Sequence, residues 1–262
     1  MIYKHNGSII TDIDGKWLTG GSTPVDPYNP LNLPPNTIRV RTNDGNVPYM
    51  VQGTSYETAT LVSGTTDVYD VYKSGTSFNN LFNHSNNIIE VLGANTSNIT
   101  EMQYMFSICS SLTTIPLFNT SKVTDMKGMF FGCTPLTTVP LFDTSKVTNM
   151  ADMFHYCSSL TTVPLFDTSS VTNMNYMFDA CASLTSVPLF DTHKVTSMNY
   201  TFYDCTSVES GALALYQQAS TQTTPPSSHA YPFCNCGYNT VTGAAELQQI
   251  PISWGGMYRS II

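Results

Sequence analysis

The stretch that decides the fold is MADMFHYCSSLTTVPLFDTSSVTN, residues 150–173. It recurs along the chain with small changes and a fixed 24-residue period. The period is marked by Met102, Met126, Met150, Met174 and Met198 and by Cys109, Cys133, Cys157, Cys181 and Cys205. A degenerate sixth copy precedes these and begins at Phe78. Self-similarity at such a period is typical of solenoids, in which repeats stack and share one core.

Each copy contains local patterns that are clearest in residues 150–173. Apolar residues at relative positions 0, 3, 4 and 7, counted from Met150, form the stripe of a two-turn helix over residues 150–157. Residues 160–163, Leu-Thr-Thr-Val, are rich in β-branched side chains and predict a short strand. Pro164 has no amide donor and is expected at the end of that strand. Because one coil cannot bury its own apolar side, the copies are expected to stack.

The composition excludes several classes of protein. Hydrophobic residues make up 41% of the chain, enough for a real core, and a net charge of −8 argues against a nucleic-acid binder. No apolar run approaches the roughly 18 residues of a membrane span. Residues 1–21 include acids at early positions and have no long apolar stretch, so no secretory signal is predicted. The seven cysteines are therefore expected as thiols.

The repeat carries a resemblance to a known family. The phrase M-x-x-M-F-x-x-C-x-x-L-T-x-V-P-L-F-D-T-S-x-V-T-N, which covers about half of the chain, resembles the leucine-rich repeats of the BspA-like bacterial surface proteins. The flanking LPPNTIRVRTNDG, TTDVYDVYKSGT and IPISWGG are similar to repeat proteins encoded by gut bacteriophages and prophages, in tail regions. BspA-like proteins usually carry an export or anchoring signal. Because no such signal is predicted here, the resemblance to the phage and prophage proteins is favoured.

The expected fold is an α/β, leucine-rich-repeat-type solenoid of about six 24-residue coils, with short parallel strands on one face and short helices on the other. Residues 1–35 are interpreted as an attachment segment with a Pro/Gly-rich linker, and residues 36–77 as an N-terminal cap. The solenoid is expected over residues 78–208, where the register ends. Residues 209–262, with two short helices, are interpreted as a C-terminal cap.

A binding surface is predicted on the helical face, because its outward positions vary between copies while the inward positions barely change. Several of these positions carry tyrosine, which offers a large contact area at a low entropy cost. The predicted ligand-binding residues, called the aromatic stripe below, are Tyr104, Phe131, His155, Tyr156, Tyr176, Tyr200 and Tyr203. The alternative interpretation is that these side chains lean on neighbouring coils and only cover hydrophobic surface.

The cysteines do not indicate a metal site or a cofactor. Thiols aligned in a row do not converge as zinc requires, so the cysteine column is interpreted as small buried apolar packing. Cys234 and Cys236 differ, because they lie in a polar loop near His229. Free thiols or one bridge are expected there, with a metal site as the alternative.

Calcium binding and catalysis are likewise not expected. The calcium-binding β-roll nonapeptide is absent, and turn-capping explains the column of Asn95, Asn119, Asp143, Asp167 and Asp191. The five histidines are scattered, and the sequence has no nucleophile-elbow, zinc-protease or phosphate-loop motif. No catalytic residue, metal or cofactor is therefore predicted.

The predicted function is non-enzymatic recognition. A phage or prophage tail-associated protein would be made in the host cytoplasm, join other virion proteins through its N-terminal segment, and contact a bacterial surface glycan or protein through the solenoid. Whether it forms a homo-oligomer stays open. The alternatives are a BspA-like adhesin at the bacterial cell surface, a polysaccharide-degrading enzyme and a purely structural decoration protein.

Overall fold

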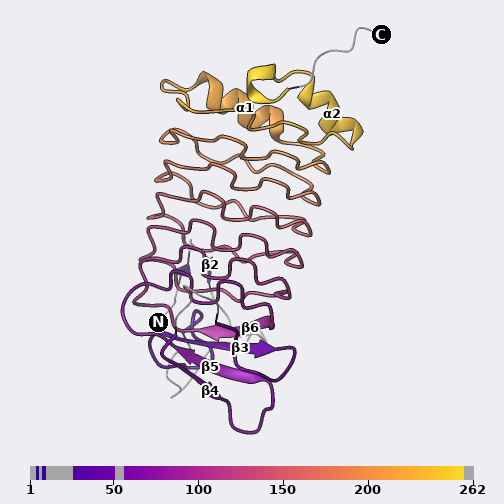
Figure 1. Ribbon diagram of the computed structural model, residues 1–262. Helices are drawn as coiled ribbons and strands as arrows, with labels where there is room; N and C mark the ends of the chain where they lie inside the picture. The colour runs from indigo at the N-terminus through magenta and orange to yellow at the C-terminus, as the bar shows by residue number, and fades with distance from the viewer. Residues whose placement is uncertain (1–3, 6–7, 10–25, 51–55, 257–262) are drawn as a thin grey trace.

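The computed structural model describes residues 4–5, 8–9, 26–50 and 56–256 (Figure 1). Regular elements in this part of the chain are short. The strands are β1 Lys4–His5, β2 Ser8–Ile9, β3 Thr37–Thr42, β4 Thr58–Leu61, β5 Val68–Tyr72 and β6 Ile88–Ala94. The helices are α1 Ala212–Thr221, α2 Val241–Leu247 and the 3-10 helix Ile252–Trp254. The residues between β6 and α1 form the stacked, ribbon-like coils in the middle of Figure 1.

An antiparallel sheet lies at the N-terminal end of the stack, with strand order β4-β5-β3-β6 (Figure 1). Strand β6 also belongs to the first coil, because Glu90 forms a parallel bridge with Thr114 of the second coil. The amide of Val91 donates to the Thr114 carbonyl at 3.2 Å. β3 therefore pairs with the outer edge of the first coil, which would otherwise present unpaired backbone groups.

Most of the predicted attachment segment, residues 1–35, lies outside the described residues. Its described end packs against the first coil. The Asn29 side chain both donates to and accepts from the Leu33 backbone, at 2.9 and 2.8 Å. Leu31 lies over Gly93, where an added Cβ would come within 2.8 Å of the Leu31 Cδ1. In later coils the equivalent outward position carries leucine, so this segment replaces the side chain that Gly93 lacks.

Parallel contacts that recur with the 24-residue period join the coils. One column of single bridges connects Ser77 to Glu101, Glu101 to Asp125, Asp125 to Asn149, Asn149 to Asn173 and Asn173 to Ser197. Beside it, amides donate to carbonyls of the preceding coil, as from Thr124 to Thr100 at 2.9 Å. The repeats therefore stack as successive rungs, as the sequence period predicted.

The helices predicted over the first eight positions of each copy are wrong; these segments are pairs of tight turns. In the fourth copy the turns are closed by amides donating three positions back, from Met153 to Met150 at 3.3 Å and from Cys157 to Phe154 at 2.9 Å. The Phe154 amide, however, donates to Met177 of the next coil at 2.9 Å. An α-helix would keep this amide bond within its own segment, so stacking competes with helix formation and prevails.

Left-handed backbone makes these turns possible. Relative positions 2 and 6 have positive φ, for example 59° at Asp152 and 61° at Tyr156. In the third copy both positions are glycine, Gly128 and Gly132, the residue that adopts this conformation at no steric cost. Apolar residues at positions 0, 3, 4 and 7 fit two successive tight turns as well as a helix, which is why the spacing alone was misleading.

The predicted parallel strands are reduced to isolated contacts. The Thr161 amide donates to Thr137 at 3.0 Å and the Thr185 amide to Thr161 at 3.1 Å. Pro164 and its equivalents have no amide donor and prevent the ladder from continuing. Within the described coils, β6 is the one strand longer than a single bridge.

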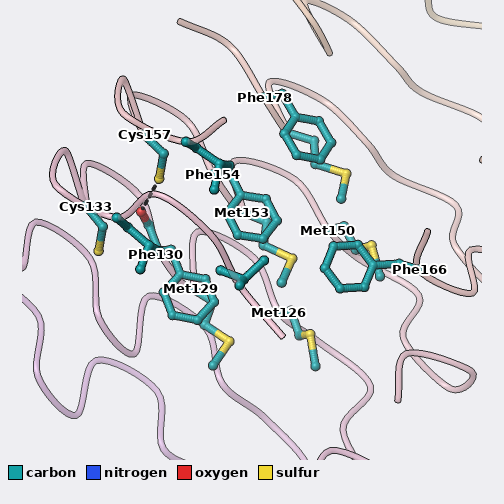
Figure 2. Packing of buried hydrophobic residues seen from close by; sticks show 14 of the residues in the cluster. Met126, Met129, Phe130, Cys133, Met150, Met153, Phe154, Cys157, Phe166 and Phe178 are labelled. Atoms are coloured by element: carbon teal, nitrogen blue, oxygen red, sulfur yellow. Dashed lines mark hydrogen bonds between the residues drawn. The ribbon is translucent and has the colours of Figure 1, made fainter. Parts of the chain in front are cut away.

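The core is built from columns of identical side chains (Figure 2). Phenylalanine rings at relative position 4 stack at 5.6 Å between Phe130 and Phe154 and at 5.3 Å between Phe154 and Phe178. This inner column consists of Phe82, Phe106, Phe130, Phe154, Phe178, Phe202 and Phe233. All seven rings are fully buried. Stacked rings and buried methionines therefore form one core that continues through every coil.

The cysteine column is buried, as predicted, and it also bonds the coils together. The Cys157 thiol donates to the Phe130 carbonyl of the preceding coil at 3.0 Å (Figure 2). The equivalent contact to the preceding coil recurs from Cys109, Cys133, Cys181 and Cys205, at 3.0–3.1 Å. Each thiol thus donates to the second lone pair of a backbone carbonyl oxygen.

The turn pattern does not end at Val208, where the 24-residue register was predicted to stop. After the insertion that contains α1, residues 228–236 repeat it. Phe233 stacks on Phe202 at 6.0 Å, and Cys236 is fully buried. The spacing of Phe233 and Cys236 equals that of Phe and Cys within each copy. Both helices expected in this region are present, and they lie at the C-terminal end of the stack (Figure 1).

Candidate functional site

The aromatic stripe lies on the face built from the tight turns, not on a helical face. Its members occupy three positions of the turn segment. Position 2 carries Tyr104, Tyr176 and Tyr200, position 5 carries Phe131, His155 and Tyr203, and position 6 carries Tyr156. Six of the seven rings are linked through ring contacts, and Tyr104 shares a surface hollow with Phe131 and His155.

Four of these rings form a parallel stack, called the outer column below. The centroid distances are 4.3 Å from Tyr156 to His155, 5.7 Å from His155 to Tyr176, and 5.0 Å from Tyr176 to Tyr200. A ring with two stacked neighbours uses both of its faces, which applies to His155 and Tyr176. The outer column therefore offers ring edges and tyrosine hydroxyls to a ligand. Tyr156, which is 53% exposed, has one stacked neighbour and keeps its other face free of stacking.

Edge-on or tilted rings flank the outer column at both ends. Phe131 meets His155 at 5.0 Å and Tyr156 at 6.0 Å, with interplanar angles of 86° and 87°. At the other end Tyr200 has Tyr203 at 5.5 Å and Tyr231 at 6.2 Å. The sequence prediction missed Tyr231 because the α1 insertion breaks the register. Its place two positions before Phe233, like Tyr200 before Phe202, was the available signal.

Two carboxylates hold His155 in the outer column. The His155 Nε2 lies 3.1 Å from Asp179 Oδ2 of the next coil, and Nδ1 lies 3.4 Å from Asp152 Oδ1. Neither nitrogen makes a well-aligned hydrogen bond, so the contacts are ion pairs. Burial alone would lower the His155 pKa, but the carboxylates of Asp152 and Asp179 outweigh it and raise the pKa to about 9. At neutral pH the imidazolium links two coils and fixes the rings stacked on it.

A hollow of about 450 Å³ lies next to this cluster and opens to solvent. It spans the first four coils. It is lined by Asn80, Asn83, His84, Tyr104, Ser107, Phe131, Asp152 and His155. Tyr104 leans across Gly128, where an added Cβ would lie 2.2 Å from the Tyr104 Cε1. Glycine at this position lets the Tyr104 ring approach the next coil closely, and Lys127 places its ammonium 5.7 Å from the ring centroid.

The tyrosines of the outer column stand where the backbone favours glycine. φ is 61° at Tyr156, 56° at Tyr176 and 55° at Tyr200. A residue with a Cβ pays on the order of 1–2 kcal/mol for this conformation. Gly128 and Gly132 show that the same turns form without side chains there. The turns therefore do not require tyrosine.

The remaining sequence-predicted features are Cys234, Cys236 and the aspartate column. Cys236 is buried in the cysteine column, Cys234 is half-buried, and both are free thiols. Within the described part of the chain, no group of three or more His, Cys, Asp or Glu side chains converges as a metal site would require. Turn-capping by the aspartate column is confirmed: Asp167 Oδ1 accepts from the Ser169 amide at 3.0 Å. The Ser169 hydroxyl and this amide lower the Asp167 pKa.

Comparison with known proteins identifies a family whose model matches this chain. A model of the family described as "Mycoplasma protein of unknown function, DUF285" matches residues 76–162 and 137–224. A solved structure of a leucine-rich repeat protein from Eubacterium ventriosum is 24% identical, with a TM-score of 0.34. That match covers 53% of this chain and 39% of the other, so the chain spans about two fifths of its length. Among curated proteins no relative matches.

No helix among the described residues is long and apolar enough to cross a lipid bilayer. The family match agrees with the resemblance of the repeat to BspA-like leucine-rich repeats, and it lies on the same coils that carry the aromatic stripe. Together the two matched segments span residues 76–224, more than half of the 262-residue chain. The chain therefore belongs to the DUF285 family, whose description records a Mycoplasma protein of unknown function.

Proposed function

We propose that this chain is a non-enzymatic recognition protein that binds a bacterial surface glycan or protein through the aromatic stripe. In the version favoured by the flanking sequences, it is a tail-associated receptor-binding protein of a phage or prophage. The N-terminal segment then attaches it to other virion proteins, and the coils carry the recognition surface.

The observation that carries this proposal is the position of the outer column. Tyr156, Tyr176 and Tyr200 occupy left-handed positions at which glycine would relieve the backbone. Stacking returns about 0.5–1.5 kcal/mol per ring pair, an amount similar to the backbone cost. The tyrosines of the column thus add little net stability. A row of tyrosine edges and hydroxyls on one face is typical of a binding surface.

The family match favours a second candidate, a protein of the bacterial cell surface. The family is described from a bacterium, and BspA-like repeats occur in bacterial surface proteins. In this version the same stripe binds host proteins or other cells. Immunogold labelling separates the two: gold on phage tails supports the first version, and gold on the bacterial envelope in the absence of particles supports the second.

The binding surface is tested with the triple variant Tyr156→Ser, Tyr176→Ser and Tyr200→Ser. Fluorescently labelled protein is incubated with a panel of bacterial cells, and bound protein is measured by flow cytometry. We expect the variant to lose binding while its circular dichroism spectrum stays that of the wild type. A matched control is Tyr238→Ser, which removes a tyrosine that is 57% exposed and lies outside the stripe.

Unchanged binding by the folded triple variant would show that the aromatic stripe is not the recognition surface. The non-enzymatic part of the proposal has its own test, in which the protein is incubated with purified surface polysaccharides and the products are separated by size. We expect the polymers to keep their length. Released fragments would contradict this part and show a degrading enzyme instead.

A further inference from the structure

We propose that the hollow beside His155 is a subsite for one uncharged sugar ring at the end of a surface glycan. The inference rests on the proposed function and names the ligand chemistry at one end of the aromatic stripe. A volume of about 450 Å³ falls within the range of small-molecule sites, roughly 300–1,000 Å³. Because the hollow opens to solvent, the rest of a longer glycan can leave it without a clash.

The lining combines apolar ring surface with groups that both donate and accept hydrogen bonds. Phe131 presents an aromatic wall whose orientation is fixed, because its perpendicular contacts with His155 and Tyr156 hold the ring. Polar groups come from the first coil, in which Asn83 bonds to Asn80 at 3.3 Å and to the His84 Nδ1 at 2.8 Å. Amide and imidazole groups match sugar hydroxyls, which also act as donors and acceptors.

The charges around the hollow disfavour an anionic ligand. No lysine or arginine is among its lining residues, and the Asp152 carboxylate is. The His155 imidazolium is already paired with Asp152 and Asp179. Lys127 lies over the Tyr104 ring outside the lining set. A phosphate or carboxylate group in the hollow would find no unpaired cation among the lining residues. A neutral sugar does not need such a cation, so its binding is not weakened in this way.

The experiment titrates the 262-residue chain with methyl glycosides of glucose, galactose and N-acetylglucosamine, and with glucuronate and glucose 6-phosphate as anionic counterparts. Binding is followed by NMR chemical-shift perturbation. We expect saturable binding of at least one neutral glycoside and at least about tenfold weaker binding of the anions. Phe131→Ala and Asn83→Ala should each weaken the neutral sugar by at least about tenfold, and Tyr238→Ala should leave it unchanged.

A second variant protects the test against a folding defect in Phe131→Ala. Asn83→Ala removes an amide without touching the ring cluster, so its result stands if Phe131→Ala is destabilised. The inference is overturned if no neutral glycoside binds, if the anions bind equally well, or if Asn83→Ala binds like the wild type. Cell binding that is lost in the triple tyrosine variant but kept in Asn83→Ala would leave the proposed function intact and remove only the subsite.

Discussion

Two of the columns of stacked rings that run along the coils lie in different places, one inside the stack and one on the turn face. The inner column repeats phenylalanine in every coil from Phe82 to Phe233, with centroid distances of 5.0–6.0 Å. The outer column combines tyrosine with one histidine, at 4.3–5.7 Å. The distances are similar, but the inner rings are fully buried and the outer rings are not.

This contrast shows which of the two columns stabilises the fold. Inner rings gain free energy from burial and stand on unstrained backbone. Of the outer rings, Tyr156, Tyr176 and Tyr200 stand on left-handed backbone, and Tyr156 and Tyr176 are 53% and 36% exposed. Stacking distance alone therefore says little about stability. Burial and backbone conformation decide it, and substitutions in the two columns should separate them.

The largest effect is expected in the inner column, from Phe154→Ala. The ring is fully buried between two others, and its removal leaves a cavity that the stacked coils cannot close. We expect a loss of about 3–5 kcal/mol in the free energy of unfolding, measured by urea denaturation. A loss below about 1 kcal/mol would show that the column is not the source of stability.

A smaller effect is expected from the ion pairs of His155. Its folded-state pKa of about 9 lies above the ordinary value of 6.5, so the contribution is complete below pH 6.5 and is lost as the pH rises through about 9. After allowance for solvent screening it amounts to about 2 kcal/mol. Urea denaturation from pH 6 to 10 measures it.

The control for this prediction is His155→Gln, which keeps a polar side chain but cannot carry the charge. The variant should be less stable at pH 6, and the difference from the wild type should shrink toward pH 10. Parallel curves for the two proteins over the whole range would contradict a protonated His155 between Asp152 and Asp179.

The cysteine column should contribute about 1 kcal/mol per coil. Cys157→Ala removes one thiol and its bond to the Phe130 carbonyl, and urea denaturation measures the loss. Iodoacetamide labelling of the native wild type provides a check on burial. Cys234, which is half-buried, should react first, whereas burial raises the pKa of Cys133 to about 12 and keeps it unreactive. Rapid labelling of Cys133 in the folded protein would contradict the stack.

Sequence reasoning could predict the repeat, the stacking and the buried positions, because one period recurs in six copies. Met150 and Cys157 are buried where the pattern placed them. The local conformation was not accessible in the same way, since the spacing of positions 0, 3, 4 and 7 is shared by a helix and by two tight turns. Gly128 and Gly132 mark the left-handed positions in one copy, but tyrosine, aspartate, isoleucine and alanine occupy them in others.

The candidate site, too, could be predicted only in part from the sequence. The aromatic stripe follows from which positions vary between copies. The hollow and the ion pair between His155 and Asp179 could not be predicted in this way, because they join side chains of different coils. Asp179 lies one repeat after His155, at the same position of the next coil, and its contact with the imidazole depends on side-chain directions that the period does not reveal. Tyr231 was hidden by the α1 insertion.

The central claim is that the three tyrosines of the outer column, Tyr156, Tyr176 and Tyr200, exist for recognition and not for stability. Tyr176→Gly tests it, because glycine relieves the left-handed backbone while both stacking contacts are lost. In urea denaturation we predict a change of no more than about 1 kcal/mol in the free energy of unfolding. A loss of about 3 kcal/mol or more, comparable to that expected for Phe154→Ala, would show that the outer column holds the coils together and contradict the claim.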